Sequence, residues 1–366
     1  MLLEALRAEN FRNLRGMIIS GPGLNILTGE NGAGKTNWLE AIDVLARARS
    51  WRTVRLTEAV KFGEKEGFAA GTVRESPEIT RQMRIVISGN TKTLAVNDKK
   101  ETVQRYLGQL HAEIFSHDEL DIVRGMPDAR RRYLDAGIVS LHPPFVQVLS
   151  DYTRVIKQKN ALLQRARDDE YSLDQTREAL IPWNEQLVKL SAKIHRSRHR
   201  FVERVSEVLE KHLFSREELT ICYVSSLEGK GDMSDFTGLI AERLHLRVQA
   251  ELSAGYSLIG PHRDDLELHF DGHDLRKFGS AGQQRSALIL LKLANISVYN
   301  ATRGEYPLFL IDDIDAELDY KRIGKLLDFL HGKTQTFVTT SKESFVQRFS
   351  SGAQIFHVTA GAAQMQ

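Results

Sequence analysis

The sequence contains Gly29-Glu30-Asn31-Gly32-Ala33-Gly34-Lys35-Thr36, which fits the phosphate-loop pattern G-x-x-x-x-G-K-T. A short apolar run at residues 24–27 precedes it, and apolar residues follow it at the helical positions 38, 39, 42 and 45. In such a strand–loop–helix unit, backbone N–H groups surround phosphates, Lys35 reaches the terminal phosphates and the Thr36 hydroxyl ligates Mg²⁺. The predicted nucleotide-binding residues here are Gly29, Glu30, Asn31, Gly32, Ala33, Gly34, Lys35, Thr36 and Asn37.

The composition is that of an ordinary globular protein with room for two or three domains. Of the 366 residues, 42% are hydrophobic and 27% are charged, so extended disorder is not expected. The single cysteine, Cys222, cannot form an internal disulfide, which fits a reducing compartment, and we expect it to be a small buried side chain. No apolar run approaches the roughly 18 residues of a membrane span, so the sequence predicts a cytoplasmic protein without a membrane partner.

The hydrophobic periodicity divides the chain into three parts. Residues 1–135 show short β-like runs around one helix, whereas residues 136–216 carry two long apolar stripes at helical spacing, separated by a polar break at residues 168–175. From about residue 218 the β-like runs return, and the chain is expected to re-enter the first domain. We therefore predict an α/β domain formed by residues 1–135 and 217–366, into which a helical lobe is inserted.

Two adjacent carboxylates end a later apolar run. Residues 307–311 are typical of a buried strand that leads directly into Asp312 and Asp313. The carboxyl edge of a parallel sheet would bring both side chains beside the phosphate loop. We expect Asp312 to hold Mg²⁺ together with Thr36, Asp313 to polarise the attacking water as general base, and Lys35 to complete the catalytic set.

A third motif, Ser280-Ala281-Gly282-Gln283, precedes a helical pattern that Ser280 can cap. It resembles the signature of ATP-binding-cassette (ABC) ATPases, which usually reads Ser-Gly-Gly-Gln, and residues 316–319 (Ala-Glu-Leu-Asp) resemble their D-loop. The resemblance implies an ABC-type P-loop ATPase domain with a mixed sheet, in which the signature of one subunit closes on the ATP of another. The nucleotide contacts implied on that side are Ser280, Gly282, Gln283 and Asp319.

Further blocks extend the resemblance over nearly the whole chain. They are residues 11–14 (Phe-Arg-Asn-Leu), 115–120 (Phe-Ser-His-Asp-Glu-Leu), 125–135 and 260–265 (Gly-Pro-His-Arg-Asp-Asp). With these blocks and the inserted lobe, the sequence resembles the RecF family of DNA replication and repair proteins. The resemblance implies ATP and Mg²⁺ as cofactors, slow DNA-stimulated ATP hydrolysis and an ATP-driven homodimer. It further implies binding to duplex DNA near single-strand gaps, where RecO and RecR are the partners that help direct RecA onto gapped DNA.

Two departures from the family pattern concern the sensing of the γ-phosphate. The family usually reads Phe-x-Pro-Glu-Asp-Leu at residues 115–120, so the sensing residue in this loop stays open. The histidine common after the last core strand of ABC ATPases is also absent, since Val338 is followed by Thr339, Thr340 and Ser341. A hydroxyl is the candidate replacement for the imidazole.

Support for DNA binding within the sequence is local, because the net charge of +2 identifies no polyanionic partner. One basic cluster lies in the second apolar stripe and another follows the phosphate-loop helix. Such clusters bind backbone phosphates with a steep salt dependence and little sequence preference, although a solvated helix face is the alternative. The predicted DNA-facing residues are Lys193, Arg196, Arg198, Arg200, Arg204 and Arg52.

Two histidine-containing segments are interpreted as structural. His262, Asp264 and Asp265 are adjacent, but neighbours in sequence rarely converge on one metal ion, so residues 260–265 predict a turn that ties the chain to the ATPase core. His195 and His199 lack a nearby third ligand and are expected at the surface.

Alternative functions remain open from the sequence alone. One is an interaction scaffold that nucleotide stabilises without useful hydrolysis, and another is a different ABC-type ATPase of chromosome maintenance. The motor subunit of a membrane transporter would share the ATP motifs but would leave the inserted lobe unexplained.

Overall fold

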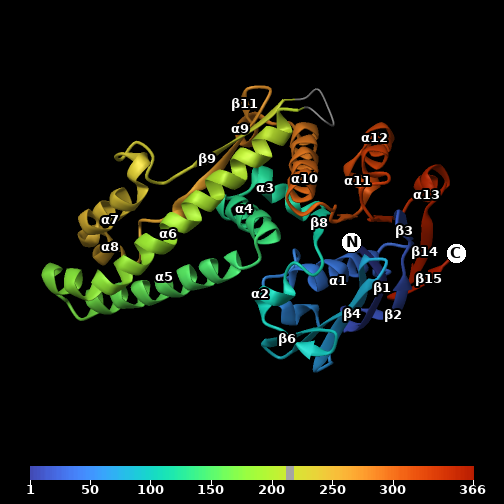
Figure 1. The fold of residues 1–366 in the computed structure, drawn as a ribbon, viewed down its shortest axis with the longest axis horizontal. Helices are drawn as coiled ribbons and strands as arrows, with labels where there is room; N and C mark the ends of the chain where they lie inside the picture. Colours follow the sequence, from blue (N-terminus) through green and yellow to red (C-terminus); the bar gives the residue numbers. More distant parts are fainter. Residues whose placement is uncertain (212–217) are drawn as a thin grey trace.

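The computed structural model describes residues 1–211 and 218–366 of the chain. Its strands form three sheets. A body built around the two larger sheets contains both termini, and long helices leave it as an elongated arm (Figure 1). The predicted α/β fold with a mixed central sheet is confirmed.

The central sheet carries the phosphate loop and the acidic pair. Its strand order is β15-β14-β3-β13-β12-β8, and every neighbouring pair is parallel except β14 with β15. The four-residue run of β12 is buried throughout, as a continuous apolar segment between two covered faces requires. The strands are β3 (Leu24–Thr28), β8 (Ala112–Phe115), β12 (Leu308–Ile311), β13 (Thr336–Thr340), β14 (Gln354–Thr359) and β15 (Ala362–Met365).

Helices cover both faces of this sheet. Leu308 and Leu310 of β12 belong to the core formed with α1 (Lys35–Arg47), whereas Phe309 and Ile311 belong to the core formed with α10 (Ala281–Arg303). This alternation places the phosphate-loop helix and the signature helix on opposite faces of one sheet. The remaining helices at the C-terminal side are α11 (Ile314–Glu317), α12 (Tyr320–Leu330) and α13 (Glu343–Phe349).

A second, antiparallel sheet with the order β2-β1-β4-β5-β6-β7 packs against α1. Residues 88–90 form the hairpin turn between β5 and β6, in which Gly89 takes a positive φ of 52°. Because α1 lies between this sheet and the central one, its apolar residues are enclosed on both sides. The strands are β1 (Leu2–Phe11), β2 (Leu14–Ile19), β4 (Glu66–Ser76), β5 (Ile79–Ser88), β6 (Thr91–Val96) and β7 (Lys99–Lys100), and α2 (Val103–Tyr106) follows them.

The arm consists mainly of three helices, α4 (Pro127–Leu141), α5 (Phe145–Asp168) and α6 (Leu173–Leu209). The predicted polar break is confirmed, because α5 ends there and Ser172 begins α6 with a capping box. At 37 residues α6 is about 55 Å long. None of the helices in the described ranges has the length and apolar character of a membrane span. The three-part division of the chain stays a prediction. Helix α4 crosses the predicted boundary at residue 135, and the predicted boundary at residue 216 lies outside the described residues.

The strands after the arm form a third sheet instead of joining the central one. Its order is β11-β10-β9, and β9 packs on α6. The chain therefore does not re-enter the central sheet near residue 218; an apolar alternation predicts a strand but does not name its partner. Cys222 is exposed, contrary to expectation, because its neighbours Ile221 and Tyr223 occupy the buried face of β9. The elements are β9 (Leu219–Val224), α7 (Phe236–Leu246), α8 (Val248–Ala254), β10 (Asp265–Phe270), β11 (His273–Asp274) and α9 (Leu275–Phe278).

Gly137 lets α4 approach α6 and provides a test of this packing. A Cβ at Gly137 would lie 2.1 Å from Cζ of Phe201. We expect Gly137→Ala to lower the free energy of unfolding by about 1–3 kcal/mol, measured by urea denaturation, and Phe201→Leu to restore part of the loss in the double variant. The control is Gly324→Ala inside α12, where a Cβ meets nothing within 4 Å and should stabilise by about 0.5–1 kcal/mol. Equal effects of the two alanines would contradict the close packing.

Candidate nucleotide site

The phosphate loop connects β3 to α1 through three glycines with positive φ. Gly29, Gly32 and Gly34 have φ values of 146°, 80° and 111°, which L side chains rarely adopt. A Cβ at Gly29 would also lie 2.4 Å from the Val358 carbonyl oxygen of β14. Glycine is therefore required here for both backbone conformation and close approach to the sheet.

Lys35 begins α1 and bends back over the loop. Its Nζ donates to the carbonyl oxygens of Gly29 and Glu30 at 2.8 and 2.9 Å. Burial lowers the pKa of Lys35 below its ordinary value, and the carboxylates of Asp313 and Asp312 oppose this effect. The ammonium group thus lies between the loop that would surround phosphates and the acidic pair.

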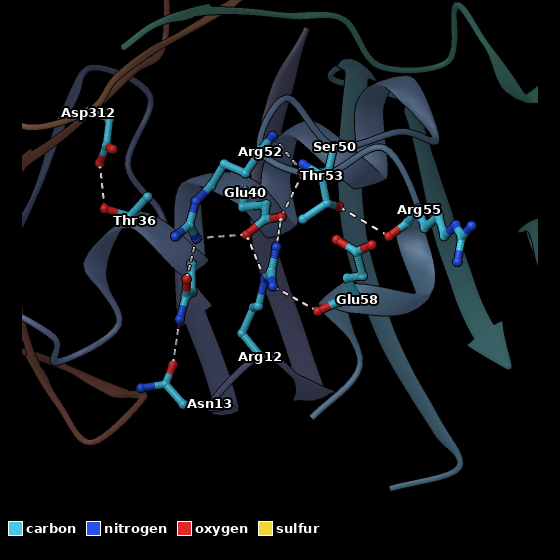
Figure 2. Close-up of polar contacts among 11 residues, drawn as sticks. Arg12, Asn13, Thr36, Glu40, Ser50, Arg52, Thr53, Arg55, Glu58 and Asp312 are labelled. Atoms are coloured by element: carbon cyan, nitrogen blue, oxygen red, sulfur yellow. Dashed lines mark hydrogen bonds and ion pairs between the residues drawn. The ribbon is translucent and has the colours of Figure 1, made fainter. Parts of the chain in front are cut away.

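Asp312 leaves the end of β12 and joins the phosphate-loop helix. Its Oδ1 accepts hydrogen bonds from the hydroxyls of Thr36 at 2.8 Å and Thr339 at 2.7 Å (the Thr36 bond is drawn in Figure 2). Burial raises the pKa of Asp312, and these two hydrogen bonds oppose the rise. The structure places Thr36 and Asp312 side by side, as the sequence predicted. A hydroxyl and a carboxylate are oxygen donors that suit Mg²⁺.

Asp313 is held in an unusual backbone conformation. Its φ is 50°, and its N–H donates to the Thr339 hydroxyl at 2.7 Å. Burial raises the pKa of Asp313, and the nearby carboxylates of Asp315 and Asp312 raise it further. A carboxylate with a raised pKa is a stronger proton acceptor, which suits the role predicted for it. Thr339 lies against both acids at the position where the sequence lacks the usual histidine.

The signature residues form an ordered helix start with a capping box. The Ser280 hydroxyl accepts from the N–H of Gln283 at 3.3 Å, and the Gln283 side chain accepts from the N–H of Ser280 at 2.9 Å. In the part of the chain that the structure describes, no hydrogen bond joins Ser280, Gly282 or Gln283 to residues 29–37. Asp319 begins α12 and accepts from two backbone N–H groups there.

Glu317 connects three segments of the site and was not singled out from the sequence. Its side chain is only 8% exposed and accepts from Arg285 Nε at 2.8 Å. Its other oxygen lies 3.1 Å from Nδ1 of His117, whose second ring nitrogen lies 3.2 Å from Arg124. The D-loop segment, the signature helix and the loop after β8 therefore meet at one carboxylate. Only the tertiary fold brings these three segments together, so no local pattern in the sequence indicates that Glu317 pairs with Arg285 and His117.

A second buried carboxylate, Glu40 of α1, organises the basic residues beside the phosphate loop (Figure 2). It pairs with Arg12 and Arg52, each at 2.9 Å, and accepts from Ser50. Burial alone would raise the pKa of Glu40, but hydrogen bonds from Arg12 and Ser50 and the two guanidinium charges lower it overall. Arg52 also donates to Asn37 at 2.7 Å.

These contacts change the role expected for Arg52. Its charge lowers the pKa of Asp312, so Arg52 lies beside the nucleotide residues and is engaged there. The Asn37 amide in turn donates to Asn13, whose own amide donates to the Ala33 carbonyl. Residues 11–14 thus brace the phosphate loop.

The predicted basic cluster on α6 divides into exposed and buried members. Lys193, Arg196, Arg200 and Arg204 are exposed. Arg198 is not available to DNA: its side chain is 4% exposed, pairs with both oxygens of Asp135 at 2.9 Å and donates to the Pro261 carbonyl. Arg198 is therefore a structural residue that joins α6 to α4, and we withdraw it from the DNA-facing set.

Residues 260–265 form a structural turn, as expected, but in the described chain the turn ties the chain to α4, α5 and α6 of the arm and not to the ATPase core. Asp265 pairs with Arg130 of α4 at 2.7 and 2.8 Å, and Asp264 accepts from Tyr223 and from the N–H of Ser226. His262 hydrogen-bonds Tyr152 at 2.6 Å, which ties the turn to α5 as well.

His195 differs from the surface position expected for it. It is half-buried and stacks on Phe236 with ring centroids 3.9 Å apart. The sequence pattern places His195 on the polar side of its helix. Phe236 of α7 covers the His195 ring in the folded protein.

The arrangement of the motifs on one mixed sheet, with a signature helix on the far face, is that of an ABC-type ATPase. The family model of the RecF/RecN/SMC N-terminal domain matches residues 2–364. Proteins named DNA replication and repair protein RecF are 33% identical in Lysinibacillus sphaericus, covering all of both chains, and 34% in Gloeobacter violaceus, covering 99% of this chain and 98% of that protein. The chain belongs to this family and, within it, to RecF.

Solved structures agree with this assignment. The recombination mediator protein RecF-ATP in the RecFOR pathway matches with a TM-score of 0.90 and 29% identity, covering 100% of this chain and 97% of that one. An SMC head bound to the C-winged helix domain of ScpA matches with a TM-score of 0.55 at 14% identity and shares the fold alone. The resemblance stated from the sequence motifs is confirmed.

The half-buried His262 predicts acid sensitivity of the folded state. Burial lowers the pKa of His262 to about 4, so between pH 6.5 and 4 the unfolded chain takes up a proton that the folded protein does not. Its contribution to stability is complete above pH 6.5 and falls by up to about 1.4 kcal/mol per pH unit below it. We expect His262→Gln to flatten the dependence of the unfolding free energy on pH in this window, measured by urea denaturation. His199→Gln, which removes an exposed imidazole, is the control, and an unchanged slope for His262→Gln would contradict the assignment.

Proposed function

We propose that the protein is an ATP-gated DNA-binding protein of recombinational repair and replication, in which two copies close around two ATP molecules. The observation that carries the proposal is the separation of the ATP-contacting motifs within one chain. The phosphate loop and acidic pair are assembled, whereas no hydrogen bond among the described residues joins the ordered signature Ser280–Gln283 to either of them. A second copy related by a two-fold axis would supply the missing half to each site.

The residues on the phosphate-loop side would bind and orient the nucleotide. The backbone of residues 29–34 would surround the phosphates, and Lys35 would exchange its two carbonyl contacts for the terminal phosphates. Thr36 and Asp312 would hold Mg²⁺, which neutralises charge on the transferring phosphoryl group. Asp313 would take a proton from the attacking water, for which its raised pKa is suited.

The residues on the opposite side would complete the pocket of the partner copy. Ser280, Gly282 and Gln283 would present hydroxyl, backbone and amide donors to the γ-phosphate, and Asp319 would contact the partner's phosphate loop. Hydrolysis would remove that phosphate and open the dimer, so slow turnover would limit the time that DNA is held. DNA would stimulate the hydrolysis by favouring the closed dimer.

Support for DNA as the partner comes from relatives and from the arm. The relatives are named as DNA replication and repair proteins, and the neighbouring solved structure belongs to the RecFOR pathway. The exposed cations Lys193, Arg196, Arg200 and Arg204 follow one another along α6. We propose that they bind backbone phosphates of duplex near a gap, and that RecO and RecR act with the protein to direct RecA there, in the cytoplasm.

Two substitutions separate nucleotide binding from hydrolysis. Lys35→Met should abolish ATP-driven dimerisation, because the ammonium that neutralises the terminal phosphates is lost. Asp313→Asn should retain ATP and accumulate dimer, because binding remains while the base is removed. Light scattering with bound-nucleotide analysis measures both; a monomeric Asp313→Asn protein with ATP bound would contradict the closed dimer.

The alternative function, an interaction scaffold that nucleotide stabilises without useful hydrolysis, is tested by measuring phosphate release from the unsubstituted protein with and without DNA.

Glu317 tests the coupling of the two halves. We propose that it positions the signature through Arg285 and thereby acts on the partner's ATP. Glu317→Gln should lower kcat for ATP hydrolysis roughly tenfold and leave KM nearly unchanged, because the residues that bind ATP in the same chain are untouched. The double variant Glu317→Gln with Arg285→Gln should lose little more than either single variant. A rise in KM with unchanged kcat would show that Glu317 acts on nucleotide binding instead.

A further inference from the structure

Beyond the signature, α10 carries further buried polar side chains that the proposed nucleotide chemistry does not use. Lys292 donates to Glu113 of β8 at 2.8 Å and to Glu119 of the following loop at 2.6 Å. Asn295, about one turn later, donates to the same Glu113 at 3.4 Å. The amide oxygen of Asn295 accepts from the hydroxyl of Tyr133 at 2.9 Å. These contacts lie at the base of the arm, where α4, α6 and α10 meet (Figure 1).

Tyr133 belongs to the arm and contacts two of its neighbours at once. It lies on α4 and is buried, and its hydroxyl donates to α10 through Asn295. The ring of Tyr133 meets the ring of Phe201 on α6 edge-on, with centroids 6.2 Å apart. Gly137, one turn further along α4, leaves the space that the Phe201 ring occupies. A continuous set of packed side chains therefore runs from α6 through α4 to the signature helix.

The outer side of α6 at this point carries exposed cations. Arg200 and Arg204 are exposed, whereas Phe201 and Val205 are buried. The proposed phosphate contacts and the contact with Tyr133 thus lie on different sides of one helix. A duplex that tilts or displaces α6 would act directly on the packing around Tyr133.

The same contacts reach the signature along a second route. Glu119 holds Lys292, and His117, two residues earlier on the same loop, lies 3.1 Å from Glu317. Glu317 in turn accepts from Arg285 in the first turns of α10. The middle and the beginning of the signature helix are therefore connected through one short loop, as well as through the helix itself.

The hydrogen bond between Tyr133 and Asn295 favours one position of α10 against the arm. Burial raises the pKa of Tyr133 well above its ordinary value, so the hydroxyl keeps its proton and remains a donor. A slide of α10 by the rise of one residue, about 1.5 Å, would separate the two groups and leave a buried hydroxyl without its acceptor. Apolar packing adapts more readily to small shifts, whereas a buried hydrogen bond restricts the arrangement.

We propose that Tyr133 and Asn295 are positioning residues that transmit duplex binding on α6 to the signature at the start of α10. The inference rests on the proposed function and names the residues through which DNA and ATP act on each other. Coupling between two binding sites is reciprocal, so ATP must raise the affinity for duplex by the same factor by which duplex raises the affinity for ATP. Weakening the contact should reduce this factor and leave each separate affinity nearly unchanged.

Fluorescence anisotropy of a labelled duplex, with and without a non-hydrolysable ATP analogue and Mg²⁺, tests the coupling. Tyr133→Phe keeps the ring that packs on Phe201 and removes the donor to Asn295. Duplex affinity without nucleotide should stay within about twofold of the unsubstituted protein, and the gain in affinity caused by the analogue should fall at least about threefold. Stimulation of kcat by duplex should fall with it, whereas KM for ATP without DNA should not change.

A second variant and a matched control separate coupling from stability. Asn295→Leu should lose the same part of the gain, and the double variant should lose little more than either single one, because both remove one contact. The control is Tyr106→Phe, which removes another buried tyrosine hydroxyl, the donor to the Leu45 carbonyl at 2.8 Å. This control should lower the free energy of unfolding by a similar amount and keep the full gain in duplex affinity.

Each outcome decides between the inference and the proposed function. A full gain in the Tyr133→Phe protein, an equal loss in the Tyr106→Phe protein or additive losses in the double variant would overturn the coupling role and leave the ATP-gated function standing. If the analogue does not change duplex affinity in the unsubstituted protein, the ATP-gated function itself falls, and the coupling role falls with it.

Discussion

The hydrogen bond from Thr36 to Asp312 is the contact on which the site depends. It joins two residues 276 positions apart and exists only because β3 and β12 end at the same edge of the central sheet. β13 lies between these two strands and contributes Thr339, which donates to the same carboxylate. The parallel register therefore assembles three chain segments into one oxygen-lined site, and any slip of β12 would carry both acids away from the loop.

Buried charge also links the signature helix α10 to β8 and the loop that follows it. Lys292 of α10 lies 2.8 Å from Glu113 of β8 and 2.6 Å from Glu119, and it is almost fully buried. Burial would lower the pKa of Lys292, but the two carboxylates raise it overall, so the ammonium stays charged. Removing such charges from water is costly, and an unpaired one costs more, so this cluster favours a single register of the signature helix against the central sheet.

The sequence predicted the motifs well and their tertiary partners poorly. The phosphate loop, the acidic pair and the cap at Ser280 each occupy a short segment whose residue types alone restrict the local backbone. Arg198 looked like its exposed neighbours on α6, but a carboxylate 63 positions away removes it from solvent. The role of Glu317 likewise depends on its contacts with Arg285 and His117. Apolar periodicity predicted the strand β9 but could not show which sheet it joins. Local pattern encodes which face is apolar, whereas charge pairing is decided by the fold.

The order already present in the signature bears on how the proposed dimer could respond to ATP. The capping box holds Ser280 and Gln283 in place before any partner arrives, and Arg285 anchors the same helix turn to Glu317. A surface that is ordered in the free subunit loses little conformational entropy on association, so more of the interaction with ATP contributes to closure. In the described part of the chain, no hydrogen bond joins the phosphate loop to the signature of the same chain. ATP bound to a single copy would therefore leave the ordered signature without a ligand. Closure would then depend on nucleotide because the γ-phosphate is the group that both halves share.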